Sequence, residues 1–182
     1  MSNVYTGIEF KKKYGNIFYK ILREDLTHRG FTFKEGINID TNKFNPYGSC
    51  SEGGLYFTNY ENIYDYLNYG TNVCSVNILD DSFVYVEYKK FKADKIKIQN
   101  ICLISDSVLF LNKTELEYII IVTQNWYALK YVPIEHKSEE ICKIAVAHNG
   151  NSLQFVPKEL KSEKICKKAV TTAGNALQFV PI

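Results

Sequence analysis

The stretch YGSCSEGGLYFT, residues 47–58, places one cysteine among serines and glycines ahead of an apolar run. Such a loop can supply a thiolate nucleophile, or backbone N–H groups that bind a phosphate. A nucleophilic cysteine needs a lowered pKa, usually from a paired histidine or a helix N-terminus. Cys50 has neither nearby in sequence, although His28 could approach it in space. We therefore interpret the loop as a tight turn that feeds a strand.

The glycines of this loop do not form a nucleotide-binding motif. A phosphate loop normally leads directly into a helix, whereas Gly53 and Gly54 lead into the strand-like run 54–58. Neither Gly-Lys-Ser/Thr nor G-x-G-x-x-G occurs in the chain. The three histidines lie in unrelated contexts, without the C-x-x-C or H-x-x-x-H spacing of a metal site. The sequence thus predicts no cofactor and no metal.

Charge is spread evenly along the chain. Residues 1–110 hold 11 Lys and 2 Arg against 7 Asp and 6 Glu, and residues 111–182 hold 9 Lys against 7 Glu, which accounts for the formal charge of +2. The only local run is Lys11–Lys13. Nucleic-acid-binding proteins usually carry a basic patch or stripe. We therefore expect no nucleic-acid partner.

Apolar runs are short throughout the sequence. None approaches the ~20 residues of a transmembrane helix, and the N-terminus lacks the apolar run of a signal peptide. The cysteines number five, which is odd. We expect a protein that is not secreted, does not enter a membrane and keeps its thiols reduced.

Residues 1–111 are expected to form an α+β head domain, because 14 Tyr and 11 Phe favour strands and a packed core. Glycine and aspartate turns separate several strand-like runs, the first with Ile17, Tyr19 and Ile21 on one face. In chain order these runs are 16–22, 28–40, 54–58, 73–78, 83–88, 94–98 and 101–104.

The clearest local pattern in the head domain is a helix that starts at Thr58 and ends at Gly70. Thr58 and Glu61 fit the T-x-x-E capping box. The apolar stripe of this helix is expected to bury its members at i, i+3, i+4 and i+7. Tyr66 and Tyr69 fall outside that stripe and are candidates for an exposed interaction surface. The stripe itself consists of Tyr60, Ile63, Tyr64 and Leu67.

Residues 112–182 contain a repeat with a spacing of 24 residues, so that equivalent leucines and prolines fall in register. We expect each unit to hold two short helices, the first capped by Thr or Ser with glutamate just inside. Asn149-Gly150 is expected to end one such helix in the left-handed conformation. The three units are 113–133, 137–157 and 161–181, with caps at Thr114, Ser138 and Ser162.

The last unit ends in LQFVPI without a polar cap, although stacked repeats usually have altered terminal units. Phe179, Val180 and Ile182 are therefore expected near an exposed apolar end. Either the head domain folds back over this end or another chain covers it. Self-association or partner binding follows from the second alternative.

Two sets of motifs resemble proteins of the giant amoeba-infecting DNA viruses of the Mimivirus group. The repeats share the pattern I-C-x-x-A-V … L-Q-F-V-P, and the stretch 30–96 carries G-x-C-x-x-G-G-L-Y-F-T and K-F-K-A-D-K-I. In that group such a domain often precedes helical or ankyrin repeats. The resemblance implies a viral protein of the host cytoplasm, the virus factory or the virion. It brings no agreed activity and no catalytic residues.

A second resemblance rests on GLYF followed by a tyrosine-rich helix, which is similar to the G-[IL]-Y-F segment of ADP-ribosyltransferases. That resemblance implies that Tyr69 stacks on nicotinamide and that a strand-borne Glu87 holds the ribose, with His28 as the third member. The family has Gly and Ser or Thr after its histidine, whereas Arg29-Gly30 follow here. Structurally, Glu87 is also explained as a residue on an exposed strand face.

The sequence therefore supports two hypotheses about function. The first is a non-enzymatic interaction or assembly protein, whose repeats bind a protein partner or a second copy of the chain. The alternative is an ADP-ribosyltransferase-like domain that binds NAD, with or without turnover.

Overall fold

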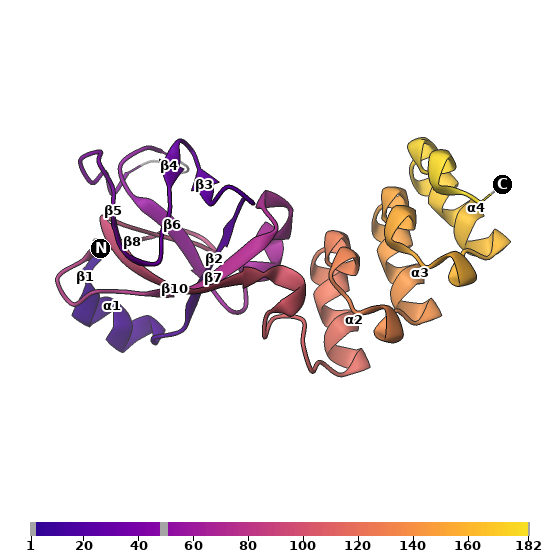
Figure 1. The fold of residues 1–182 in the computed structure, drawn as a ribbon, viewed down its shortest axis with the longest axis horizontal. Coiled ribbons are helices and arrows are strands. Elements are labelled where there is room, and N and C mark those ends of the chain that lie inside the picture. Colours follow the sequence, from indigo (N-terminus) through magenta and orange to yellow (C-terminus); the bar gives the residue numbers. More distant parts are fainter. Residues whose placement is uncertain (1–2, 48–50, 182) are drawn as a thin grey trace. The chain divides into compact units, whose positions relative to one another are not determined.

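The computed structural model describes residues 3–47 and 51–181. The chain forms two compact units, Met1–Leu103 and Ile104–Ile182, which we call the N-terminal unit and the C-terminal unit. The first is dominated by strands and the second by helices (Figure 1). This arrangement confirms the α+β fold class.

Eight strands of the N-terminal unit form one antiparallel sheet in the order β1-β8-β9-β6-β2-β7-β10-β5. A separate two-stranded hairpin, β3-β4, turns at Arg29 and Gly30, both with positive φ, as a two-residue hairpin turn requires. The strands are β1 (Val4–Thr6), β2 (Phe18–Leu22), β3 (Thr27–His28), β4 (Phe31–Thr32), β5 (Gly36–Ile39), β6 (Leu55–Asn59), β7 (Asn72–Asn77), β8 (Phe83–Val86), β9 (Phe91–Ala93) and β10 (Lys95–Leu103).

Helix α1 (Gly7–Tyr14) was not anticipated from the sequence. Its N-cap, Thr6, accepts a hydrogen bond from the Glu9 backbone N–H, and the Glu9 carboxylate accepts one from the Thr6 backbone N–H. This is a complete capping box. Phe10 of α1 packs its ring 4.9 Å from Phe91 and 5.1 Å from Phe18, so the helix anchors an aromatic core.

Strand β2 does not present the predicted face. Ile17 precedes the strand and is 69% exposed, whereas Phe18 and Leu22 are buried. Ile21 of the predicted face is buried as well, so residues on both faces of β2 are covered and the strand has no single apolar face. Lys20 is buried there as well, at 4% exposure.

The predicted helix at Thr58 was wrong in its start and in its type. Thr58 belongs to β6, and its hydroxyl donates to the Lys89 carbonyl at 2.7 Å, so it cannot cap a helix. A 3-10 helix, η1 (Ile63–Tyr69), follows instead, with Asn62 as its N-cap. The predicted apolar positions Ile63, Tyr64 and Leu67 are buried, and the helix ends at Gly70 as expected.

The structure corrects the predicted bounds of strands β8 and β10. The runs 94–98 and 101–104 belong to one strand, β10, which continues through a bulge between Gln99 and Cys102. Strand β8 ends at Val86, so Glu87 lies in the turn that follows it, where its N–H donates to the Lys90 carbonyl.

In the described part of the C-terminal unit, residues 104–181, there are three α-helices, each followed by a 3-10 helix (Figure 1). The predicted caps Thr114, Ser138 and Ser162 are confirmed, because each side chain accepts a backbone N–H three residues on. The helices are η2 (Ile104–Asp106), α2 (Glu115–Gln124), η3 (Trp126–Lys130), η4 (Ile134–His136), α3 (Glu139–His148), η5 (Gly150–Phe155), η6 (Lys158–Leu160), α4 (Glu163–Thr172) and η7 (Gly174–Phe179).

Helix α3 does not end in a left-handed residue. Asn149 is extended, with φ of −150°, and its side chain accepts the Asn151 N–H, so it caps the next helix, η5. The predicted Asn-Gly C-terminus is therefore an N-cap for a following 3-10 helix. Within the described residues, no helix combines the length and the apolar character required to cross a bilayer.

Consecutive α-helices of the C-terminal unit pack against each other, α2 on α3 and α3 on α4. Cys142 and Cys166 occupy equivalent positions in α3 and α4, and both are buried in the core. At the start of the unit, Leu109 and Phe110 are also buried, and the Tyr118 hydroxyl donates to the Phe110 carbonyl. Residues before α2 thus cover the first repeat.

Candidate functional site

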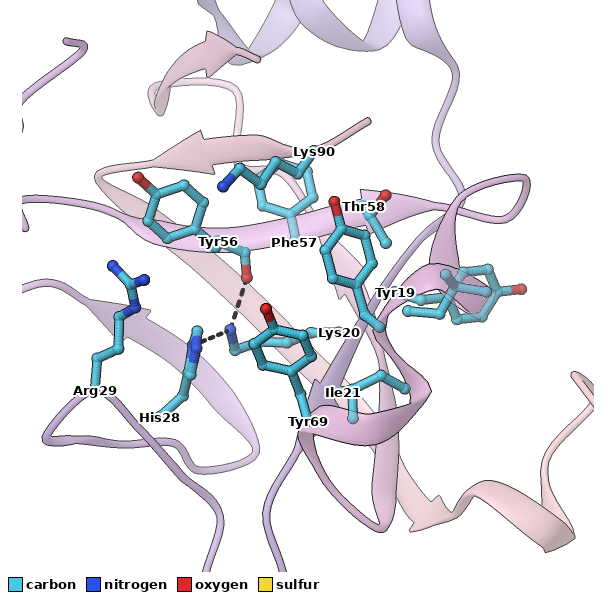
Figure 2. Close-up of a pocket in the computed structure, with 12 residues that line it drawn as sticks. Tyr19, Lys20, Ile21, His28, Arg29, Tyr56, Phe57, Thr58, Tyr69 and Lys90 are labelled. Carbon is cyan, nitrogen blue, oxygen red and sulfur yellow. Dashed lines mark hydrogen bonds between the residues drawn. The ribbon is translucent and has the colours of Figure 1, made fainter. Parts of the chain in front are cut away.

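A pocket opens in the N-terminal unit where β2, the β3-β4 hairpin, β6 and η1 meet (Figure 2). Its lining combines basic and aromatic side chains. No Asp or Glu is among the described lining residues. The side chains that matter for chemistry are Lys20, His28, Arg29, Tyr56, Tyr66, Tyr69 and Lys90.

Lys20 lies at the centre of the residues drawn in Figure 2, and its ammonium group has two polar contacts. The Nζ atom donates to the Tyr56 carbonyl at 2.7 Å and lies 3.2 Å from His28 Nδ1. It also lies 4.5 Å from the centre of the Phe33 ring. Burial lowers the pKa of Lys20 to about 8, because a low-dielectric surrounding disfavours the charged form.

His28 is neutral near pH 7. Burial, and after it the positive charges of Lys20 and Arg29, lower the pKa of His28 to about 4. Its Nδ1 atom therefore accepts from the Lys20 ammonium, and the tautomer with the proton on Nε2 follows. His28 supplies a donor to the pocket but no compensating negative charge.

The Tyr56 ring is surrounded by cations. Lys90, Lys92 and Arg29 lie 4.8 Å, 5.4 Å and 5.7 Å from its centre. Glu87 reaches the same region, where its Oε2 atom lies 3.3 Å from Lys90 Nζ. Burial, followed by the charge of Glu87, raises the pKa of Tyr56. Glu87 thus offsets part of the positive charge near Tyr56.

Of the three residues of the NAD hypothesis, two line the pocket and one does not. His28 and Tyr69 both line the pocket, with ring centres 6.4 Å apart and planes nearly perpendicular. Glu87 is not among the lining residues. Its side chain is only 7% exposed, so the interpretation as an exposed residue of a strand face was wrong. The cause is the turn after β8, which directs Glu87 toward Lys90 and Tyr56.

The two tyrosines predicted to form an exposed interaction surface differ in their exposure. Tyr69 is 56% exposed, whereas Tyr66 is half-buried, and its hydroxyl lies 3.4 Å from the Lys89 carbonyl. Cys50 lies outside the described residues. Beyond it, Gly53 and Gly54 have positive φ and lead into β6, as expected for a glycine turn that feeds a strand.

Sequence reasoning missed Lys20, Arg29 and Lys90. Lys20 gave a signal, because it stands inside the apolar run FYKIL, where a solvated lysine is out of place. Arg29 and Lys90 gave none. Arg29 lies in the turn of the β3-β4 hairpin and Lys90 in the turn between β8 and β9, and only the folded unit brings these two turns to one pocket.

The last repeat of the C-terminal unit exposes a face that the earlier repeats bury. Leu129 and Leu153 are fully buried, whereas Leu177, at the equivalent position, is 65% exposed. Phe179 and Val180 are half-buried, and Ile182 lies outside the described residues. The apolar end therefore centres on Leu177.

Two equivalent glycines show what that face lacks. A Cβ atom added to Gly150 would lie within 3.0 Å of the Ala169 carbonyl, because α4 packs directly on this backbone. A Cβ added to Gly174 would meet nothing within 4 Å. Position 150 requires glycine because α4 packs against its backbone. Position 174 also has glycine, although no neighbouring atom requires it there.

The C-terminal unit matches a known family. Residues 118–161 and 138–182 each match the model of a domain of unknown function, DUF4116. The matched segments overlap and together include α3, α4 and the 3-10 helices between them.

The chain is similar to proteins of Acanthamoeba polyphaga mimivirus, which confirms the resemblance to the Mimivirus group. One, named as a candidate ankyrin repeat protein (R868), is 32% identical over 52% of this chain and 46% of its own length. The uncharacterized protein R869 is 37% identical over 36% of this chain and 49% of its own. A further candidate ankyrin repeat protein, R229, is 38% identical over 44% and 29%. The chain thus spans about half the length of the first two relatives, and no solved structure matches it.

Proposed function

We propose that this protein acts in a giant virus by protein–protein interaction, and that two copies associate through the open face of the last repeat. The observation that carries the proposal is the contrast between Gly150 and Gly174. Each earlier repeat buries this face against the next one. The last repeat presents the same shape to an incoming surface.

The open face is suited to a second copy. Leu177 and the half-buried Val170 supply apolar area, and Gly174 supplies a backbone that a helix can approach closely. A two-fold axis would place the same face of each copy against the other, and this closed arrangement is the commonest among homo-oligomers. The first repeat has no such role, because Leu109 and Phe110 are buried at the start of the unit.

The relatives support an interaction role. Two of those described above are named as candidate ankyrin repeat proteins of a giant virus. Stacked repeats present extended surfaces that bind other proteins. Carried over to this chain, this leads us to propose protein partners in addition to the second copy. We place them in the host cytoplasm, the virus factory or the virion.

Light scattering over a concentration series tests self-association of the full chain. The molar mass should rise toward the dimer with concentration, and Leu177→Lys should keep the chain monomeric, because a charge cannot be buried in an apolar contact without a partner. Ile134→Lys is the matched control. Ile134 is 67% exposed, close to the 65% of Leu177, and a lysine, Lys158, stands at its position one repeat later. A wild-type chain that is monomeric at every concentration excludes the dimer.

A second candidate function is binding of NAD in the pocket of the N-terminal unit. It is favoured by His28 and Tyr69, which come from separate elements and share that pocket. Because Glu87 is held by Lys90, no carboxylate among the described lining residues faces a ribose. We therefore propose binding without transfer.

Thermal denaturation in NAD tests this candidate. Ligand at about 100 times its dissociation constant stabilises a protein by about 2.7 kcal/mol. The stabilisation should disappear in Tyr69→Ala and persist in Tyr88→Ala, a tyrosine that is 86% exposed and not among the lining residues. Absence of any shift in millimolar NAD would argue against the site.

A further inference from the structure

Lys20 is a buried cation without a carboxylate partner. Its side chain is 4% exposed, and among the described residues no Asp or Glu lies within ion-pair distance of its Nζ atom. Its contacts are a carbonyl, a neutral histidine and a phenyl ring. Removing a charge from water without pairing it costs several kcal/mol. An uncompensated ammonium beside an open pocket calls for an anion.

No neighbouring side chain supplies that negative charge. The Cys74 thiol interacts with Lys20, but burial raises the pKa of Cys74 to about 12, so the thiol stays neutral. Glu87 pairs with Lys90 rather than with Lys20. Arg29 adds a further positive charge to the same lining, and Lys90 adds one that its pair with Glu87 offsets in part.

The size of the pocket limits which group enters it. Its volume is about 80 Å³. At roughly 10–15 Å³ for each water molecule, this holds a group of several heavy atoms, such as a phosphoryl group. It does not enclose a nucleobase as well. A ring attached to that group must therefore lie at the mouth, where Tyr69 is 56% exposed.

We propose that this pocket binds a phosphate monoester that carries a planar ring, of the nucleoside monophosphate class. The phosphoryl oxygens accept from Lys20, Arg29 and Lys90, and the ring stacks on Tyr69. A monoester dianion suits this site better than the diphosphate of NAD, because it concentrates its charge on one group. The inference shares its pocket with the second candidate function but is independent of self-association.

Titration calorimetry of the full chain tests the proposal with four probes: AMP, adenosine, inorganic phosphate and NAD. AMP should bind most tightly. Adenosine lacks the anion and phosphate lacks the ring, so each should bind at least tenfold more weakly. Equal affinity for adenosine or for phosphate overturns the proposal. Tighter binding of NAD than of AMP overturns it as well, in favour of the second candidate.

Variants assign the binding to this pocket. Lys20→Met should weaken AMP binding at least tenfold, whereas Lys95→Met, which removes the surface pair with Asp81, should leave it unchanged. Because a buried position can affect folding, Tyr69→Ala provides a second test at an exposed site. It should weaken the binding of AMP but not of phosphate. AMP binding that survives in both Lys20→Met and Tyr69→Ala overturns the assignment.

The pH dependence of binding gives a further readout. An anion beside Lys20 raises the pKa of its ammonium, so AMP binding should take up a proton when it is measured above pH 8. Calorimetry in buffers of different ionisation enthalpy measures that uptake. Lys20→Met should abolish it, and uptake that persists in this variant contradicts the role of Lys20.

Discussion

The two units of this protein bring their functional residues together over different distances along the chain. In the C-terminal unit a helix packs on the helix one repeat away, and the open face is a copy of faces buried nearby. In the N-terminal unit the pocket joins Lys20, Tyr56 and Lys90, which stand far apart in sequence. A repeated unit can thus be understood by comparison with its neighbour, whereas the pocket depends on the whole sheet.

The largest expected effect contrasts two equivalent leucines. Leu153→Ala should lower the free energy of unfolding by about 3 kcal/mol, because it deletes a fully buried side chain. At concentrations where the chain is monomeric, Leu177→Ala, at a 65% exposed position, should change it by less than about 0.5 kcal/mol. The single tryptophan, Trp126, lies in the C-terminal unit, so urea unfolding followed by its fluorescence reports on this unit. If both variants lost the same free energy of unfolding, Leu177 would not lie on an open face.

The two equivalent glycines should differ as well. Gly150→Ala should cost about 2 kcal/mol, because its Cβ meets the backbone of α4, which cannot move aside as a side chain could. Gly174→Ala should be neutral or slightly stabilising in the monomer. Gly70→Ala, which would meet the Leu22 carbonyl, should instead lower the stability of the N-terminal unit, seen by circular dichroism. A change confined to the Trp126 signal in Gly70→Ala would contradict the division into two units.

The buried Lys20 should make the stability of the N-terminal unit depend on pH. Its pKa is about 8 in the folded protein and near 10.5 in the unfolded chain, so the unfolded chain binds more protons between these values. The stability contributed at this position therefore rises as the pH increases from about 8 to 10.5. Relative to Lys20→Met, wild-type stability should recover by on the order of 1–3 kcal/mol over this range. Urea unfolding of wild type and Lys20→Met at several pH values measures this recovery. If their free energies of unfolding differ by the same amount at every pH, Lys20 does not carry an uncompensated charge.

The smallest effect concerns the helix caps. Thr114→Ala and Thr6→Ala should each cost about 1 kcal/mol, since each threonine completes a capping box. In Thr114→Ala the loss should appear in Trp126 fluorescence, and in Thr6→Ala it should appear in the N-terminal unit. The serine variants Thr114→Ser and Thr6→Ser keep the accepting hydroxyl and serve as controls. Losses of the same size in the serine variants would show that the hydroxyl is not the cause.

Three of the four T-x-x-E motifs in the sequence show how far local patterns predict this fold. Those at Thr6 and Thr114 form capping boxes, and the one at Thr58 does not. The residues are the same, but Thr58 lies in a strand that pairs with β2 and β9, and its hydroxyl binds the Lys89 carbonyl. Pairing with distant strands overrides a local signal. The caps of the repeats were predictable because only nearby residues compete with them.

The candidate pocket was predictable only in part. His28 and Tyr69 were named from a resemblance to another family, and the structure places them around the same cavity. Lys20 was not named, because its environment comes from the β3-β4 hairpin, β6 and β7 rather than from its own neighbours in sequence. The 24-residue spacing, in contrast, was visible directly in the chain.

The repeat geometry also bears on how such chains change length during evolution. Each unit begins with a capped helix and ends at an equivalent proline, Pro133, Pro157 or Pro181. Recombination between the similar gene segments that encode two units can therefore add or remove a complete structural unit. Such an event leaves the helix caps and the prolines of the other units in place. It also leaves the fold of the N-terminal unit intact, so the two units can diverge at different rates.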